Sequence, residues 1–367
     1  MSSVTTSTGP SAGSPAPQGS SRRRASGTSA VGLVGVELRR LWWRRLTKVV
    51  LLGLVVFAGV STFAAYQQTS PAALAQRTSD YTSMVEDMKR QEAQVSPQDR
   101  AAQQEACLKE QTAARVNDPT VDFGCDQQFR VPTPAEFGIV AADRDSITLD
   151  IAKNGYAVLA FLALLLGASF VAAEFASGSM GNWLTFEPRR VRVAASKIVA
   201  ATVGGLAIGA AGVALTLLGS ALVTAINTPP PGLPAAPPVE VPGGSLGFLL
   251  LRVVAICALA GLGGAVLGLL LRSTAGVIGA SLGWLLVVEA YVGAAFAEGR
   301  LQPWLMRTNV EGFVNAGSTY FATTCGPEGC QSTGVAHSYT ASWVFLLVLT
   351  VVAVPVAVMA FRSRDVT

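Results

Sequence analysis

The sequence predicts an all-α integral membrane protein with six transmembrane helices and a helical outer loop after the first of them. Half of its 367 residues are hydrophobic, and only 14% are charged. The mean hydropathy of +0.45 is too high for a soluble globule of this length. Basic residues also gather in the segments that six crossings would place on one side. We therefore expect the helices to lie in a lipid bilayer.

Six apolar runs are long enough to cross a bilayer, which takes about 20 helical residues. Within the hydrocarbon a chain must satisfy its backbone hydrogen bonds internally, so each run is expected to be a helix. We expect the transmembrane helices at residues 49–66, 155–173, 198–226, 245–271, 275–297 and 341–361.

Lysine and arginine set the orientation, because they accumulate in cytoplasmic segments beside membrane spans. Six crossings place the connection at 174–197 and the turn at Arg272 on the side of the N-terminus, and the chain ends on that side at 362–367. We therefore expect both termini in the cytoplasm and the chain in the plasma membrane. Residues 1–30 lack the apolar core of a signal peptide and predict a disordered tail. The basic residues before the first run are Arg22, Arg23, Arg24, Arg39, Arg40, Arg44, Arg45 and Lys48, against the single acid Glu37.

The first outer loop, residues 67–153, holds nine basic and fourteen acidic residues, a net charge of minus five. Its first part is rich in Gln, Ala, Glu and Arg, which predicts helix. Few large apolar residues are available for a separate core, so we expect a small helical extracytoplasmic cap. The proline-rich outer loop at 227–244 cannot be helical throughout.

Four of the five cysteines form two close pairs in these outer segments, where an oxidising environment permits disulfides. Four cysteines allow three pairings, and nearness in sequence favours Cys107 with Cys125 and Cys325 with Cys330. A metal site is the alternative, but the chain has one histidine, His337, and no second ligand cluster beside these thiols. We predict no metal.

Residues 31–48 predict an amphipathic interfacial helix that lies against membrane lipid. Val34, Leu38 and Leu41 share one face, while Glu37, Arg40 and Arg44 share another. The segment is either an ordinary basic flank that sets orientation or a helix that contacts a partner.

Glycines recur at helix-packing spacing in spans three to five, as in the pairs Gly205 and Gly209, Gly264 and Gly268, and Gly279 and Gly283. Small residues let membrane helices approach closely, so these are packing positions. No GxxxxGK[ST] loop occurs, so this chain has no ATPase site of its own. We expect no catalytic residues, no bound cofactor and no nucleic-acid partner.

The connection at 174–197 carries the strongest functional signal. A short helix from Ser177 to Phe186 would place Met180, Trp183 and Leu184 on one side. An apolar patch on a cytoplasmic loop favours a docking site. The alternative for Trp183 is anchoring at the membrane interface.

This connection resembles that of the permease subunits of type-2 ATP-binding-cassette (ABC) exporters, particularly the six-span actinobacterial type. The resemblance implies that residues 174–197 contain a coupling helix docked on a separate cytosolic ATPase, present in two copies with ATP and Mg. It also implies ATPase contact by 31–48, a second permease copy in a homodimer, and re-entrant helices within the outer loop at 298–340. The matching residues are Glu174, Gly178, Ser179, Leu184, Thr185, Glu187, Pro188, Arg189, Arg190 and Lys197.

Two charges lie inside spans, Arg252 and Glu289. Each is roughly 10–12 Å below the outer edge at 1.5 Å per residue, and the two spans are joined by a short inner turn. Because unpaired charges in lipid are costly, we predict that the two side chains form an ion pair.

Together these features predict a permease that exports an amphipathic or lipid-like molecule or drug, using ATP hydrolysed by another subunit. The alternative is a membrane sensor or assembly factor whose outer loop binds a ligand or protein.

Overall fold

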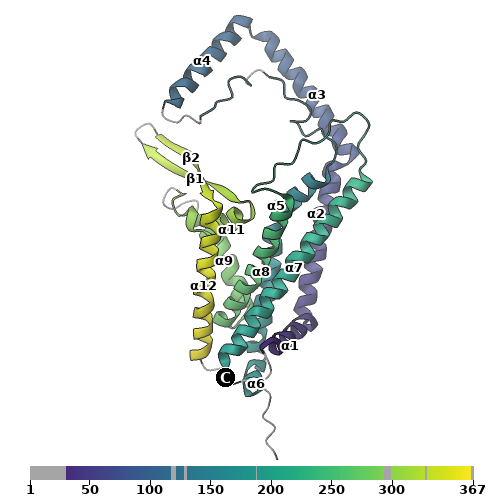
Figure 1. Cartoon of the computed structure of the whole chain (residues 1–367). Helices are drawn as coiled ribbons and strands as arrows, with labels where there is room; N and C mark the ends of the chain where they lie inside the picture. Colours follow the sequence, from purple (N-terminus) through teal and green to yellow (C-terminus); the bar gives the residue numbers. More distant parts are fainter. Residues whose placement is uncertain are drawn as a thin grey trace, which may run out of the picture.

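The computed structural model describes residues 30–116, 121–127, 130–186, 188–292, 299–326 and 329–364. Helices bundle at one end of the molecule, and a helical arm extends from the other end (Figure 1). Residues 1–29 of the predicted disordered tail and residues 365–367 lie outside the described part of the chain.

Within the described residues, six helices are long and apolar enough to cross a membrane, which agrees with the predicted number and order of the spans. Several begin earlier than predicted, because polar residues before the apolar run continue the helix. They are α2 (Arg45–Thr69), α5 (Arg144–Ala176), α7 (Arg190–Ile226), α8 (Leu246–Leu271), α9 (Thr274–Gly283) continuing as the π-helix η1 (Trp284–Val292), and α12 (Tyr339–Ser363).

The core of the bundle is formed by α5, α7 and α8. Half of the apolar window of α5 and of α8 is buried, against 11% for α2. Glycines allow this close packing: a Cβ on Gly264 would lie 2.1 Å from the carbonyl oxygen of Leu164, and one on Gly205 would lie 2.3 Å from that of Cys257. The packing prediction is thus confirmed in α7 and α8. It is wrong in α9, where a Cβ on Gly279 or Gly283 would meet no described atom within 4 Å.

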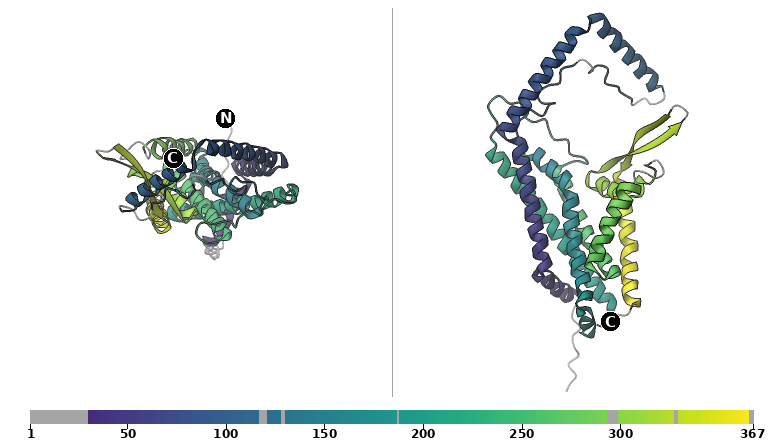
Figure 2. Two further views of the ribbon diagram at one scale, coloured as in Figure 1. Left: turned by 90° about the horizontal axis from the view of Figure 1, so that it is seen from above. Right: turned by 180° about the vertical axis from the view of Figure 1, so that it is seen from behind.

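The segment after the first span forms an arm of two helices, α3 (Pro71–Gln94) and α4 (Pro97–Arg115), as Figure 2 also shows from behind. Ser70 and Ser96 each accept a backbone N–H and precede a proline, which is a typical helix start. A disulfide joins Cys107 of α4 to Cys125 of the returning segment, with Cα atoms 5.7 Å apart. The helical character predicted for this segment and the disulfide predicted between Cys107 and Cys125 are confirmed.

The segment before α12 adds a small β element to a chain that is mostly helical, as predicted. It contains a 3₁₀ turn (Gln302–Trp304), the short helix α11 (Met306–Val314) and an antiparallel hairpin of β1 (Gly317–Gly326) and β2 (Gly329–Ser338). The strands are rich in Thr, Ser, Tyr and Phe, side chains that favour extended backbone over helix. Cys330 is disulfide-bonded, and the register places Cys325 directly opposite it.

Two short helices lie at the opposite end of the bundle from the arm. They are α1 (Ala30–Trp43), which covers most of the predicted amphipathic segment, and α6 (Ser179–Phe186). The end of α12 also lies there (Figure 1). We call this the inner end.

Replacing Gly264 with alanine tests the core packing. The new methyl group would meet the carbonyl oxygen of Leu164 and the backbone nitrogen of Ala168, and backbone atoms cannot move independently. We expect a loss of stability of about 1–3 kcal/mol, measured by thermal unfolding in detergent.

The matched control is Gly263→Ala on the same helix, where the methyl group meets no atom within 4 Å. It should leave the protein as stable as the parent or slightly more stable, because alanine favours helix. Equal melting temperatures for the two variants would contradict this account of the core.

Candidate functional site

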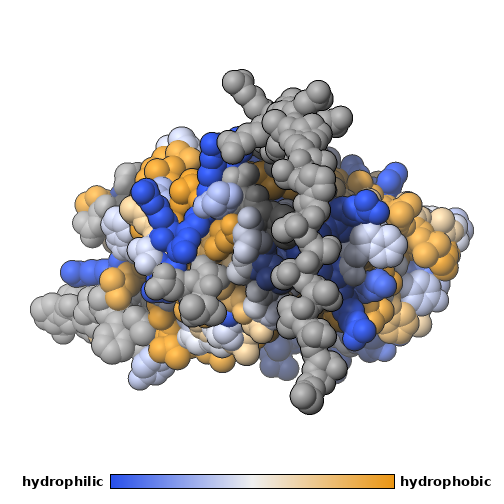
Figure 3. All heavy atoms as spheres, turned by 90° about the horizontal axis from the view of Figure 1, so that it is seen from below, coloured by the Kyte–Doolittle hydropathy of each residue, from blue (hydrophilic) through white to orange (hydrophobic). Residues whose placement is uncertain are grey.

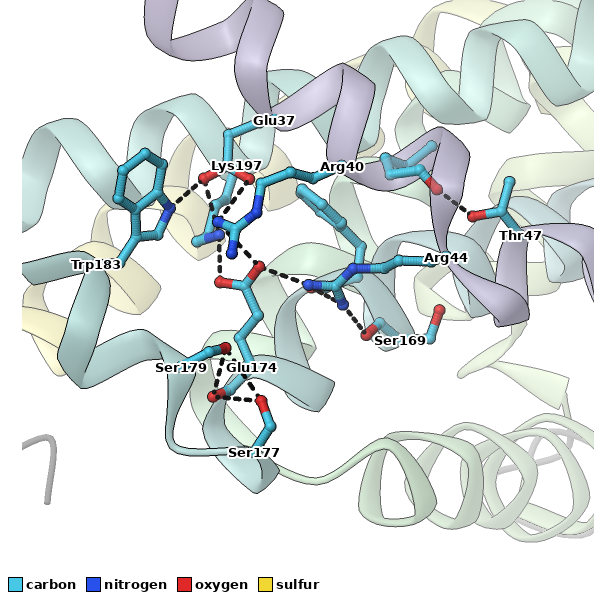
Figure 4. Close-up of polar contacts among 12 residues, drawn as sticks. Glu37, Arg40, Arg44, Thr47, Ser169, Glu174, Ser177, Ser179, Trp183 and Lys197 are labelled. Atoms are coloured by element: carbon cyan, nitrogen blue, oxygen red, sulfur yellow. Dashed lines mark hydrogen bonds and ion pairs between the residues drawn. The ribbon is translucent and has the colours of Figure 1, made fainter.

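Four helical elements meet at the inner end around a buried cluster of charged side chains. We call it the inner cluster; Figure 4 shows its members pointing toward one another. It contains Glu37 and Arg40 of α1, Arg44 between α1 and α2, Glu174 of α5, Trp183 of α6 and Lys197 of α7.

Lys197 lies at the centre of the inner cluster. Its Nζ is 2.9 Å from Glu37 Oε1 and 2.5 Å from Glu174 Oε2, and the side chains of all three are at most 1% exposed. Buried charges of one sign are tolerated only when groups of the other sign compensate them. The ammonium group therefore holds α1, α5 and α7 together.

Trp183 connects α6 to the same cluster. Its indole Nε1 donates to Glu37 Oε1 at 2.6 Å, and the guanidinium carbon of Arg40 lies 5.1 Å from the centre of the indole ring. The second contact is a cation–π interaction. Through these contacts α6 is attached to α1 as well as to α5, the helix that precedes it in the chain.

Arg44 lies in the break between α1 and α2, where the backbone is extended and no side chain caps α2. It donates to Glu174 Oε1 at 2.5 Å and to the carbonyl oxygen of Phe170 at 2.8 Å. Burial lowers the pKa of its guanidinium, and the carboxylate of Glu174 opposes that shift. The break therefore directs a third cation toward α5.

Chemically, the inner cluster is a network of ion pairs and hydrogen bonds between helices. It brings three cations to two carboxylates, and the paired side chains hold one another in place. Among the described residues, no group of three or more His, Cys, Asp or Glu side chains could hold a metal ion. Its contacts connect the short helices α1 and α6 to the long helices α5 and α7.

The predicted docking patch is wrong in one respect. The helix is present as α6, but Met180 is fully buried in the core of the bundle, and Trp183 and Leu184 pack against that core. An amphipathic pattern identifies the apolar face, and here the protein's own bundle covers that face. The exposed side of α6 carries Asn182 and Thr185.

The remaining predicted docking residues have different environments. Arg189 is exposed at the start of α7. Arg190 donates to the carbonyl oxygens of Arg362 and Arg364, so it binds the end of α12. Glu187 lies outside the described residues.

The predicted ion pair between Arg252 and Glu289 is also wrong. Glu289 accepts from the backbone N–H groups of Met306 and Arg307, at 2.7 and 3.1 Å, and from the indole of Trp284. Arg252 donates to the carbonyl oxygen of Val314 at 2.8 Å. The two side chains thus bind opposite ends of α11.

This arrangement follows from helix electrostatics. The first N–H groups of a helix carry partial positive charge and its last carbonyls carry partial negative charge. The carboxylate of Glu289 meets the first residues of α11, and the guanidinium of Arg252 meets its last residue. Nine helical residues extend about 13 Å, which separates the two charges.

Sequence reasoning gave no paired role to Glu37, Arg40, Arg44 or Lys197. A signal was available, because Glu37 is the only acid among the first 48 residues and Lys197 directly precedes an apolar run. Charges beside or within apolar segments require partners, so these two could have been matched.

Lys197→Met tests the inner cluster. The variant leaves two buried carboxylates without their central cation, and we expect a loss of about 3–5 kcal/mol of stability by thermal unfolding in detergent. The control is Arg90→Gln, which breaks an exposed pair with Asp87 and should leave the melting temperature unchanged.

The double variant Lys197→Met with Glu37→Gln should lose less than the sum of the single losses, because one uncompensated carboxylate is removed along with the cation. The glutamine can still accept from Trp183. Additive losses would contradict the coupling of Lys197 to Glu37.

Exchanging the two charges in Arg252→Glu with Glu289→Arg distinguishes the α11 arrangement from an ion pair. An ion pair would survive the exchange. In the observed arrangement each new charge has the same sign as the partial charge of the helix end that it meets, so both contacts are repulsive. The double variant should therefore be less stable than either single variant, as measured by thermal unfolding. Recovery in the double variant would contradict the observed arrangement.

The comparisons add no relative to this description. The chain matches no protein-family model and no curated protein. What the inner cluster does is therefore inferred from its contacts and its position in the fold.

Proposed function

We propose that this chain is the permease subunit of an ABC exporter in the plasma membrane, with both termini in the cytoplasm. Two copies of a separate ATPase bind and hydrolyse ATP with Mg, and a second permease copy completes a homodimer. The observation that carries the proposal is the inner cluster, which connects two short helices at the inner end to the ends of two core helices.

In this proposal, a displacement of α6 moves the bundle through a chain of direct contacts. Trp183 of α6 binds Glu37 of α1. Lys197 of α7 binds both Glu37 and Glu174 of α5, so α7 and α5 move with α1. Close packing of α5, α7 and α8 resists deformation within the core, so the three helices move together. Motion driven by nucleotide at the inner end thereby reaches the membrane-spanning part.

The docking surface in this proposal is the exposed side of α6, with Asn182, Thr185 and the neighbouring Arg189. It replaces the apolar face that the bundle covers. The buried face fixes α6 to the permease, and the polar face remains available to the ATPase.

The transported molecule in this proposal is amphipathic or lipid-like. Large apolar side chains cover the outward faces of the spanning helices, including Leu52, Val56 and Val60 of α2. A molecule that crosses along such surfaces must tolerate an apolar environment.

A sensor or assembly factor is the second candidate, and the arm favours it. α3 and α4 are largely exposed, and only Leu74 and Gln111 of the two helices are buried. A disulfide between Cys107 and Cys125 joins α4 of the arm to the segment that follows it in the chain. Such an arm could present a surface to a ligand or protein without any use of ATP.

Purification from native membranes tests the proposal. The chain should carry a stoichiometric ATPase, and vanadate-sensitive ATP hydrolysis should require both subunits. Asn182→Arg with Thr185→Arg should weaken ATPase binding about 30-fold or more, since bulky charge at the centre of an interface removes a hot spot. The amount of membrane-inserted permease should not change.

The control is Gln103→Arg with Gln104→Arg on the arm, which should leave ATPase binding unchanged. Unchanged ATPase binding in the α6 variant would contradict the proposed docking surface but not the permease assignment. Complete function of the chain in vesicles without any ATPase would contradict the permease assignment and favour the sensor.

A further inference from the structure

The two faces of α1 differ in a way that the inner cluster does not explain. Its inward face carries Leu33, Glu37 and Leu41, which are buried at a helical spacing of four residues. Glu37 is the only acidic residue of this region, and its carboxylate is enclosed by Lys197 and Trp183. The acid of α1 is thus directed away from the surface.

The outward face is consequently positive. Arg39 on α1, and Arg45 and Lys48 at the start of α2, are exposed. Among the described residues, no carboxylate oxygen lies within 4 Å of these three side chains. The positive charge of these three side chains is therefore not balanced by a neighbouring carboxylate of the described residues.

Large apolar side chains accompany these charges. Trp42 and Trp43 are 62% and 70% exposed, and Val36 and Leu46 are also exposed. Seen from the inner end, hydrophilic and hydrophobic residues are interspersed on the molecular surface (Figure 3). Indole rings prefer the headgroup level of a bilayer, where an apolar ring and a polar N–H are both satisfied.

The location of this face in the fold also favours the headgroup region of a bilayer. The outward face lies where α1 joins the first spanning helix, so it is at the depth where the apolar surface of α2 begins. Basic residues at this depth attract anionic headgroups by about 1 kcal/mol each. A zwitterionic headgroup offers no net charge to match.

We propose that Arg39 and Trp43 on the outward face of α1, together with Arg45 and Lys48 at the start of α2, bind the headgroups of anionic phospholipids. Bound lipid would hold α1 at the membrane surface while Glu37 holds its other face to the bundle. This binding depends on α1 and the start of α2 and does not require that an ATPase docks on α6.

Native mass spectrometry of the purified full chain tests the proposal, with phosphatidylglycerol or phosphatidylcholine added to the detergent. The parent should retain phosphatidylglycerol preferentially. Replacing Arg39, Arg45 and Lys48 with glutamine should weaken that binding roughly 100-fold, about fivefold per charge. Loss of the preference in this variant supports the site.

The matched control replaces three exposed basic residues of the arm, Lys89, Arg90 and Lys109, with glutamine. It should leave the preference unchanged. Equal retention of the two lipids by the parent, or equal weakening in control and variant, would overturn the proposal.

A photo-reactive amino acid at position 43 identifies the occupant in native membranes. A covalent adduct with the mass of an anionic phospholipid supports the proposal, and an adduct with a polypeptide overturns it. ATPase co-purification is measured separately, so failure of the lipid site and failure of the permease assignment are distinguishable.

Discussion

A buried ammonium group requires negative charge around it, and Lys197 obtains that charge from two different helices. This requirement determines the arrangement of the inner end. Glu37 must turn inward, which fixes the rotation of α1, and Glu174 must face α7 at the end of α5. Trp183 and Arg44 then bind the same carboxylates, which fixes α6 and the break before α2. The glycine-dependent core provides the rigid base to which these pieces attach.

The spanning helices were predictable because their signal is strong and local. An uninterrupted apolar run of about 20 residues has few other solutions in a membrane. The β1–β2 hairpin was not predicted, since its strands lie outside the apolar runs and depend on pairing with each other. Helix ends were also misjudged, as at α5, where Asp143 caps a helix that begins well before its apolar part.

The site was partly predictable for a different reason. A helical pattern shows which side of α6 is apolar, but not whether another part of the chain covers it, and Met180 is covered by the bundle. Likewise, the predicted pairing of Arg252 with Glu289 rested on their positions along two connected spans, and each side chain instead contacts α11. Those positions gave no sign that α11 would come between them. In both cases, residues that are distant in the sequence but adjacent in the fold determine what the side chain contacts.

The position of α11 between Arg252 and Glu289 makes this helix a spacer of fixed length. One anchor belongs to α8 and the other to η1, so the distance between these two anchor points is matched to a helix of nine residues. If α8 and η1 separate, at least one terminal contact of α11 must break. Widening at this point therefore exposes either a carboxylate or a guanidinium that the resting arrangement keeps engaged with backbone groups. The spacing of α8 and η1 at this level is thus set by the length of one short helix.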